Sequence, residues 1–161
     1  MRWLIDGYNV IRRDPELARH EAHNLEDGRA ELMRLIGSAA RRSGDPFTVV
    51  FDGARRGGGT PAGGQVQVLF SRPPESADDV LRRLASELRS GAVVVSSDRT
   101  VSQAAARAGA AAVTTEQFLA ALDTTGAEPD DDEVAPRAGG NPRRPSRAER
   151  AAERALARLR R

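Results

Sequence analysis

Short apolar runs alternate with longer segments of helical spacing along most of this chain. Apolar side chains dominate the runs at residues 3–5, 47–51, 92–95 and 111–113, and residues 65–70 alternate polar with apolar side chains. These patterns predict five short strands. The helical or small-residue segments cover residues 24–42, 76–89, 99–108 and 115–122. We predict a helix over each of them, with the first helix of the chain beginning at Asn24.

Strands separated by helices favour a three-layer α/β/α domain with a mostly parallel central sheet. We expect this domain to occupy residues 1–122. Residues 123–145 are rich in proline, glycine and acidic side chains, which is typical of a disordered linker. In parallel sheets, ligands bind outside the carboxyl ends of the strands. Residues that directly follow strands are therefore the first candidates for a functional site.

The last segment, residues 146–161, is predicted to be an arginine-rich helical tail that begins with a capping box of Ser146 and Glu149. Its apolar stripe is thin, so we expect it to become ordered only on a partner. Residues 137–161 carry nine arginines against two glutamates, whereas residues 1–127 carry sixteen arginines and sixteen acids. A neutral body with a basic tail favours a polyanionic partner for the tail. The alternative is a disordered tail that only improves solubility.

Composition excludes several classes of site. All 25 basic residues are arginine, and the chain has no cysteine. A disulfide framework and a thiolate metal site are therefore impossible, and His20 with His23 offers too few ligands for zinc. No run approaches the roughly 18 apolar residues of a membrane helix. Charge interrupts the N-terminal segment too early for a signal peptide, so we expect a soluble, cytoplasmic protein.

Four aspartates stand at or near the ends of predicted strands. Asp6, Asp52 and Asp98 follow strands, and Asp78 lies in the first turn of the helix after the third strand. In a parallel sheet, all four would lie on its carboxyl edge. Each one alone could be a turn former or a helix cap. Together they would repel one another unless a cation bound them, and such hard oxygen ligands suit Mg²⁺ or Mn²⁺.

The neighbouring acid Asp79 has a simpler explanation. Ser76 and Asp79 have the spacing of a capping box, so Asp79 is expected to hold the start of its helix. Asp78, one position earlier, is left to point elsewhere.

Four motifs carry a family resemblance: "LIDGYNVI" at 4–11, "VVFDG" at 49–53, "ESADD" at 75–79 and "SSDRTVSQ" at 96–103. In order and spacing they resemble the NYN branch of the PIN-like nucleases, in particular its YacP-like group, which includes a ribosome-associated endoribonuclease of bacteria. The resemblance covers about residues 2–122. It implies a parallel sheet, a Mg²⁺ or Mn²⁺ site and cleavage of RNA phosphodiester bonds. Translated or ribosome-associated mRNA is then a candidate substrate, and RNA or the ribosome is the expected partner of the basic tail.

The resemblance also implies roles for single residues. Asp6, Asp78 and Asp98 match metal-binding aspartates of the family, and Asp52 matches an acid that binds metal through water. Asn9 matches an asparagine that orients Asp6 or contacts a phosphate. In this interpretation, metal-activated water attacks phosphorus in line and leaves a 5′-phosphate and a 3′-hydroxyl.

Arginines near the motifs are candidates for binding substrate phosphates. Arg55 and Arg56 belong to the glycine-rich segment "RRGGGTPAGG", which could equally be a flexible connector, and Arg72 and Arg99 are further candidates. Tyr8 is expected either to stack on a base or to pack beneath the site.

Three other functions compete with nuclease activity as interpretations of this sequence. Receiver domains need a lysine after the last strand, and haloacid-dehalogenase-like phosphatases need Asp-x-Asp and a lysine. This chain has no lysine, and Tyr8 stands two residues after Asp6. The alternative that stays open is a non-catalytic RNA- or ribosome-binding module on the same fold. The presence of all four acids favours catalysis.

Overall fold

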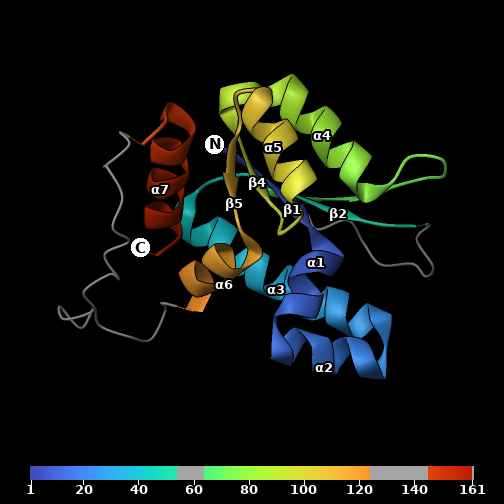
Figure 1. Ribbon diagram of the computed structural model, residues 1–161. Coiled ribbons are helices and arrows are strands. Elements are labelled where there is room, and N and C mark those ends of the chain that lie inside the picture. Colours follow the sequence, from blue (N-terminus) through green and yellow to red (C-terminus); the bar gives the residue numbers. More distant parts are fainter. Residues whose placement is uncertain (54–63, 124–144, 161) are drawn as a thin grey trace, which may run out of the picture.

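A parallel sheet forms the centre of the molecule (Figure 1). The computed structural model describes residues 1–53, 64–123 and 145–160. Within these residues the sheet has five strands in the order β3-β2-β1-β4-β5, and all of its strand pairs are parallel. The strands are β1 (Arg2–Asp6), β2 (Phe47–Phe51), β3 (Val66–Phe70), β4 (Ala92–Val95) and β5 (Ala111–Val113). The predicted fold class and the five predicted strands are thus confirmed.

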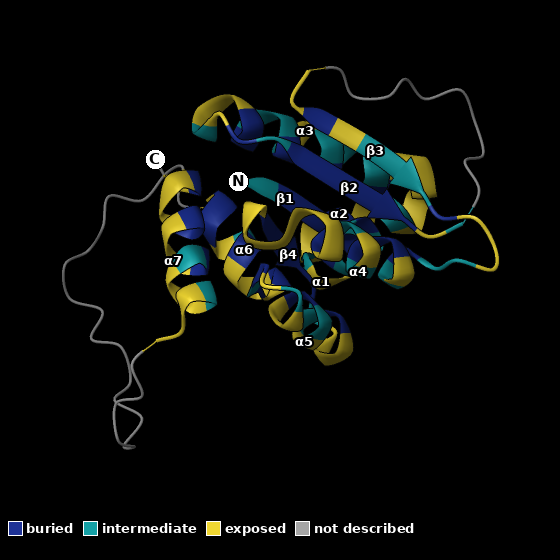
Figure 2. Ribbon diagram, turned by 90° about the horizontal axis from the view of Figure 1, so that it is seen from above, coloured by how far each residue is buried: buried dark blue, intermediate teal, exposed yellow. Residues whose placement is uncertain are grey.

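Helices cover both faces of the sheet (Figures 1 and 2). They are α1 (Gly7–Arg13), α2 (Pro15–His23), α3 (Leu25–Ser43), α4 (Ala77–Leu88), α5 (Arg99–Arg107), α6 (Thr115–Asp123) and α7 (Arg147–Leu159), with a 3₁₀ turn at Arg89–Gly91. One face packs against α4 and α5, and the other against α1, α3, α6 and α7. The arrangement is the three-layer α/β/α architecture that the sequence predicts.

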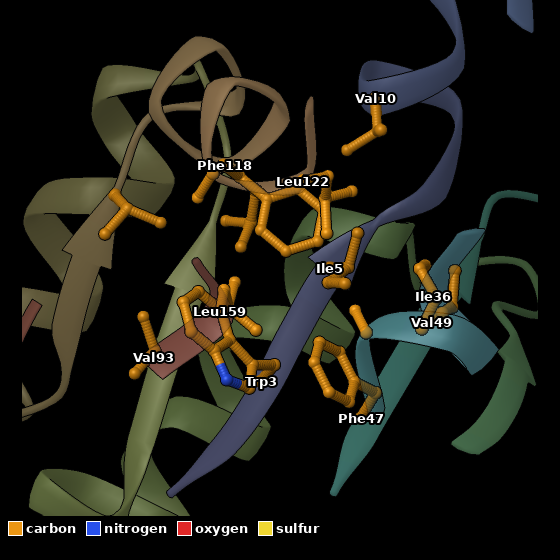
Figure 3. Packing of buried hydrophobic residues seen from close by; sticks show 14 of the residues in the cluster. Trp3, Ile5, Val10, Ile36, Phe47, Val49, Val93, Phe118, Leu122 and Leu159 are labelled. Carbon is orange, nitrogen blue, oxygen red and sulfur yellow. The ribbon is translucent and has the colours of Figure 1, made fainter. Parts of the chain in front are cut away.

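Alternation along each strand divides the core into two clusters. Leu4, Val50 and Val94 pack toward α4 and α5. Their strand neighbours pack on the opposite face, where Trp3 stacks on Phe47 with ring centres 5.9 Å apart (Figure 3). Successive side chains of a strand point to opposite faces, so short apolar strands supply both clusters. The central strands are buried on both sides, as parallel sheets require.

Two helices, α1 and α2, precede the helix that the sequence predicts as the first. The prediction that helical structure begins at Asn24 is therefore wrong. Among its nine residues, α2 buries only Leu17, so no apolar period marks it. Its signals are polar: the carboxylate of Asp14 accepts hydrogen bonds from the N–H groups of Glu16 and Leu17, and Pro15 occupies the first helical position.

The C-terminal helix α7 is part of the core rather than a free tail. Ala152, Ala155, Leu156 and Leu159 are buried in the cluster that also holds Trp3. Alanines on the inner face allow close packing against β5 and α6, and the two leucines fill the remaining space. The expectation that this helix becomes ordered only on a partner is therefore wrong, although its capping box is confirmed.

An ion pair fastens α7 to the body of the protein. Nη2 of Arg158 donates to both carboxylate oxygens of Asp45, at 3.1 and 2.9 Å. Asp45 is only 5% exposed and also accepts from the indole N–H of Trp3 at 3.4 Å. The buried carboxylate thus has partners that offset its desolvation.

The linker predicted at residues 123–145 falls almost wholly outside the described residues, so the proposed division of the chain into domain, linker and tail stays a prediction. Among the described helices, none combines the length and the apolar character needed to cross a bilayer.

Candidate active site

A pocket of about 490 Å³ opens at the carboxyl edge of the sheet, where β1 and β2 end. Its lining residues are Asp6, Tyr8, Asn9, Arg12, Arg13, Asp52, Ser76, Ala77 and Asp78. The chain winds from β1 through β2 to β3 and then returns to the other side of β1 with β4. The end of β1 is therefore the topological switch point, where doubly wound sheets bind their ligands.

Asp6 joins the central strand to the first helix. It ends β1 and caps α1, with its carboxylate accepting a hydrogen bond from the backbone N–H of Asn9 at 3.1 Å. Burial raises the pKa of Asp6, and the negative charges of Asp78 and Asp52 raise it further. The Asn9 hydrogen bond and the positive charge of Arg12 act in the opposite direction. Asp6 is thus a carboxylate with unfavourable negative neighbours.

Gly7 allows α1 to start directly behind Asp6. A Cβ atom at this position would collide with the aromatic ring of Phe51. Phe51 is buried and packs against Tyr8 and Phe70, with ring centres 5.1 and 5.7 Å away, so it has no room to withdraw. The "DGYN" motif therefore needs glycine for a packing reason, which brings Tyr8 and Asn9 to the pocket.

Asp52 connects three segments at the pocket. Its Oδ1 accepts a hydrogen bond from the hydroxyl of Ser71 at 2.5 Å and another from the backbone N–H of Ala77 at 3.3 Å. These contacts tie the end of β2 to the end of β3 and to the start of α4. Asp52 therefore helps to set the position of the neighbouring Asp78.

Asp78 lies in the first turn of α4 and is part of the pocket lining. Asp79 forms the predicted capping box with Ser76, which confirms the assignment of these two residues. Burial raises the pKa of Asp78, the charge of Asp98 raises it further, and Arg82 at 3.8 Å opposes both. Asp78 and Asp6 thus line one pocket as two carboxyl groups whose raised pKa values disfavour the charged form.

Asp98 does not line the pocket. It is exposed and caps α5, with its carboxylate accepting from the backbone N–H groups of Thr100 at 2.6 Å and Val101 at 3.4 Å. These hydrogen bonds, first that of Thr100, lower the pKa of Asp98. Its charge still reaches Asp78, whose pKa it raises. Three of the four aspartates therefore share the pocket, and Asp98 stands at its margin.

Side chains at the start of α6 bind the residues of α1 that line the pocket. The hydroxyl of Thr115, which is fully buried, donates to Oδ1 of Asn9 at 2.7 Å. The next residue, Glu116, pairs with Arg13 at 2.7 Å and accepts a bond from the Ser97 hydroxyl at 3.3 Å. The side-chain oxygen Oδ1 of Asn9 thus accepts one hydrogen bond, and the NH₂ group of the same amide can donate to a ligand.

Arg12 and Arg13 are pocket residues that sequence reasoning missed, because it missed α1. Tyr8 lines the pocket as well, and its ring also packs on Phe51, so its position is compatible with both predicted roles. The sequence signal that could have revealed Arg12 is its helical spacing, because it follows Tyr8 by four residues.

The remaining arginines and histidines considered from the sequence lie away from the pocket or outside the described residues. Arg72 and Arg99 are exposed and do not line the pocket. Arg55 and Arg56 lie outside the described residues. His20 and His23 are exposed on α2.

The donor set of the pocket suits a hard cation, although it is not a ready-made cage. Among residues 1–53, 64–123 and 145–160, no group of three or more acidic or histidine side chains is arranged to hold a metal ion. Mg²⁺ commonly binds through only one or two carboxylates, and water and substrate phosphates complete its coordination. Asp6 and Asp78 both line the pocket and match that requirement, and the negative charge of Asp78 raises the pKa of Asp6.

A doubly wound parallel sheet with carboxylates gathered at its switch point places this chain among the nuclease-like α/β domains. The family model described as "YacP-like NYN domain" matches residues 3–161. The chain belongs to this YacP-like NYN family. The match extends through α7, in agreement with the packing of that helix in the core.

Individual relatives agree with this assignment. The curated "Uncharacterized protein YacP" of Bacillus subtilis (strain 168) is 31% identical over 102 residues, which span 60% of this chain and 60% of that relative. A crystal structure of Rae1 (YacP) from Bacillus subtilis has a TM-score of 0.67 and 29% identity, and the match covers 77% of this chain and 74% of the other. A mutant of the same protein gives a TM-score of 0.65, 27% identity and coverage of 77% and 75%.

Proposed function

We propose that this protein is a divalent-metal-dependent endoribonuclease, which hydrolyses RNA phosphodiester bonds and leaves a 5′-phosphate and a 3′-hydroxyl. The observation that carries this proposal is the two-sided pocket of a nuclease-like fold. Asp6, Asp52 and Asp78 form its acidic part, and Arg12 and Arg13 form its basic part. Carboxylates can hold a cation while arginines bind the phosphate that the cation must reach.

Each residue of the pocket has a role in this proposal. Asp6 and Asp78 would hold Mg²⁺ or Mn²⁺, with Asp98 contributing from the margin. The bound ion would polarise a phosphate oxygen and lower the pKa of a water nucleophile. Asp52 fixes the start of α4 and thereby the position of Asp78. The Asn9 amide, held by Thr115, donates toward the phosphate or its attacking water.

The proposal is tested by cleavage of a 3′-labelled RNA with a 5′-hydroxyl end in Mn²⁺ by the wild-type protein and by Asp78→Asn. We expect cleavage by the wild type, its loss on chelation, and products that a 5′-phosphate-dependent exonuclease degrades. Asp78→Asn should bind the RNA without cutting it. Equal cleavage by both proteins would refute the proposal. Binding by both without cleavage would favour a non-catalytic RNA- or ribosome-binding module.

The exposed face of α7 is proposed to strengthen binding to RNA, free or in the ribosome. Arg147 and Arg154 are exposed on this helix, and Arg160 is exposed directly after it. Removal of residues 137–161 would also remove Leu156 and Leu159 from the core, so substitution of charge is the cleaner test. Arg154→Gln should reduce the slope of log affinity against log salt by about 0.7 for a lost contact to a single strand. Arg107→Gln is the control, because Arg107 is exposed at the end of α5, and identical slopes for both variants would contradict the proposal.

A further inference from the structure

Arg12 on α1 and Arg29 on α3 form a row of positive charge that leads away from the pocket. The guanidinium carbon of Arg29 lies 5.9, 5.8 and 5.7 Å from the ring centres of Tyr8, Phe51 and Phe70. That of Arg12 lies 5.6 Å from the ring centre of Tyr8. Arg12 and Tyr8 line the pocket, so Arg29 is separated from it by a single side chain.

The charges of Arg12 and Arg29 are less neutralised by ion pairs than those of neighbouring arginines. Arg13 is paired with Glu116 at 2.7 Å, and Arg82 is paired with Asp79 at 2.9 Å. By contrast, the contact of Arg12 with Glu21 is 4.0 Å long. The positive charges of Arg12 and Arg29 are therefore the ones that an incoming anion could neutralise.

Arg29 in particular is poised for a ligand. Within the described residues, it takes part in none of the ion pairs, and its buried Nε has no hydrogen-bond partner. Contact with aromatic faces stabilises a guanidinium, but it does not satisfy a buried N–H donor. A phosphate would supply the missing negative charge and could accept hydrogen bonds from the terminal nitrogens of the guanidinium group.

We propose that Arg12 and Arg29 form a phosphate-binding track for an RNA strand that leaves the acidic pocket over Tyr8. This inference rests on the proposed function, because it takes RNA as the ligand of the pocket. Arg12 borders the pocket and Arg29 lies beyond Tyr8, so the track binds the RNA backbone from the scissile phosphate outward and fixes which phosphate lies beside Asp6 and Asp78. Tyr8 serves as the apolar support that holds the two guanidinium groups in place. The contacts are to phosphates, so they carry no preference for base sequence.

The track is tested by binding rather than by cleavage. A 5′-fluorescein-labelled single-stranded oligoribonucleotide is titrated with the Asp78→Asn protein, and anisotropy is recorded at several salt concentrations. Adding Arg12→Gln or Arg29→Gln to this protein should weaken binding and reduce the salt slope by about 0.7 for each lost contact. The change should be alike for oligonucleotides of different sequence.

Arg41→Gln is the matched control, because Arg41 is exposed on the same helix α3 near its opposite end. It should leave affinity and slope unchanged. Arg12 is exposed, so Arg12→Gln tests the track even if Arg29→Gln unfolds. Affinity and slope like those of the Asp78→Asn parent in folded Arg12→Gln and Arg29→Gln proteins would overturn the inference. If the wild-type protein does not cleave RNA but these substitutions still weaken RNA binding, the track is supported and only the nuclease proposal is refuted.

Discussion

Asp6→Asn is expected to slow Mn²⁺-dependent RNA cleavage by at least about a hundredfold and to raise the unfolding temperature of the metal-free protein. Cleavage is lost because a neutral amide replaces a metal-binding carboxylate. The helix cap survives, since asparagine also accepts a hydrogen bond from the Asn9 N–H. Stability rises because the substitution removes a charge that burial, Asp78 and Asp52 all disfavour.

The pH dependence of this stability gain follows from the raised pKa of Asp6. A carboxyl group with a raised pKa in the folded state favours folding at low pH, and this contribution is lost as pH rises through that pKa. The difference in unfolding temperature between wild type and Asp6→Asn should therefore shrink on acidification. Thermal unfolding in a chelating buffer at several pH values measures it.

Asp14→Asn supplies the matched control. Asp14 caps α2 as Asp6 caps α1, but it does not line the pocket. This variant should cleave RNA at the wild-type rate. An Asp6→Asn protein that cleaves as fast as Asp14→Asn would contradict the assignment of Asp6. A lower unfolding temperature for Asp6→Asn would contradict the electrostatic argument.

Leu159→Ala is expected to destabilise the protein by about 2–5 kcal/mol, although it lies almost at the end of the chain. Its side chain is 1% exposed and belongs to the cluster around Trp3 and Phe118 (Figure 3). Truncation leaves a cavity that the packed sheet cannot close. Denaturation in urea, followed by circular dichroism, measures the loss.

The same truncation at an exposed leucine separates burial from composition. Leu25 is 46% exposed at the start of α3, and Leu25→Ala should cost less than about 0.5 kcal/mol. Equal unfolding midpoints for Leu159→Ala and Leu25→Ala would mean that α7 is not part of the cooperative core.

The apolar pattern predicts the sheet well because the strands are buried on both faces. Residues 47–51 and 92–95 are almost entirely apolar, and each forms a strand within these bounds. The pattern fails for α1 and α2, whose starts depend on the carboxylates of Asp6 and Asp14 rather than on an apolar period. It also fails for α7, because a stripe of alanines looks too weak to pack unless the surface that receives it is known.

In the candidate site, too, local sequence rules predict some residues and fail for others. Strand ends locate Asp6 and Asp52, and the capping box at Ser76 leaves Asp78 available, so three acids of the pocket follow from local rules. Asp98 obeys the same rule but is used as a cap by α5. Arg12 and Arg29 could not be found in this way, because their meeting at Tyr8 depends on how α1 and α3 pack together.

The most direct test of the account is a calorimetric titration of Mn²⁺ into the wild-type protein, Asp6→Asn, Asp78→Asn and Asp14→Asn at neutral pH without RNA. The account predicts binding to the wild type and to Asp14→Asn, and affinity at least about tenfold weaker in the two pocket variants. Equal Mn²⁺ affinity in all four proteins would show that Asp6 and Asp78 do not form a metal site.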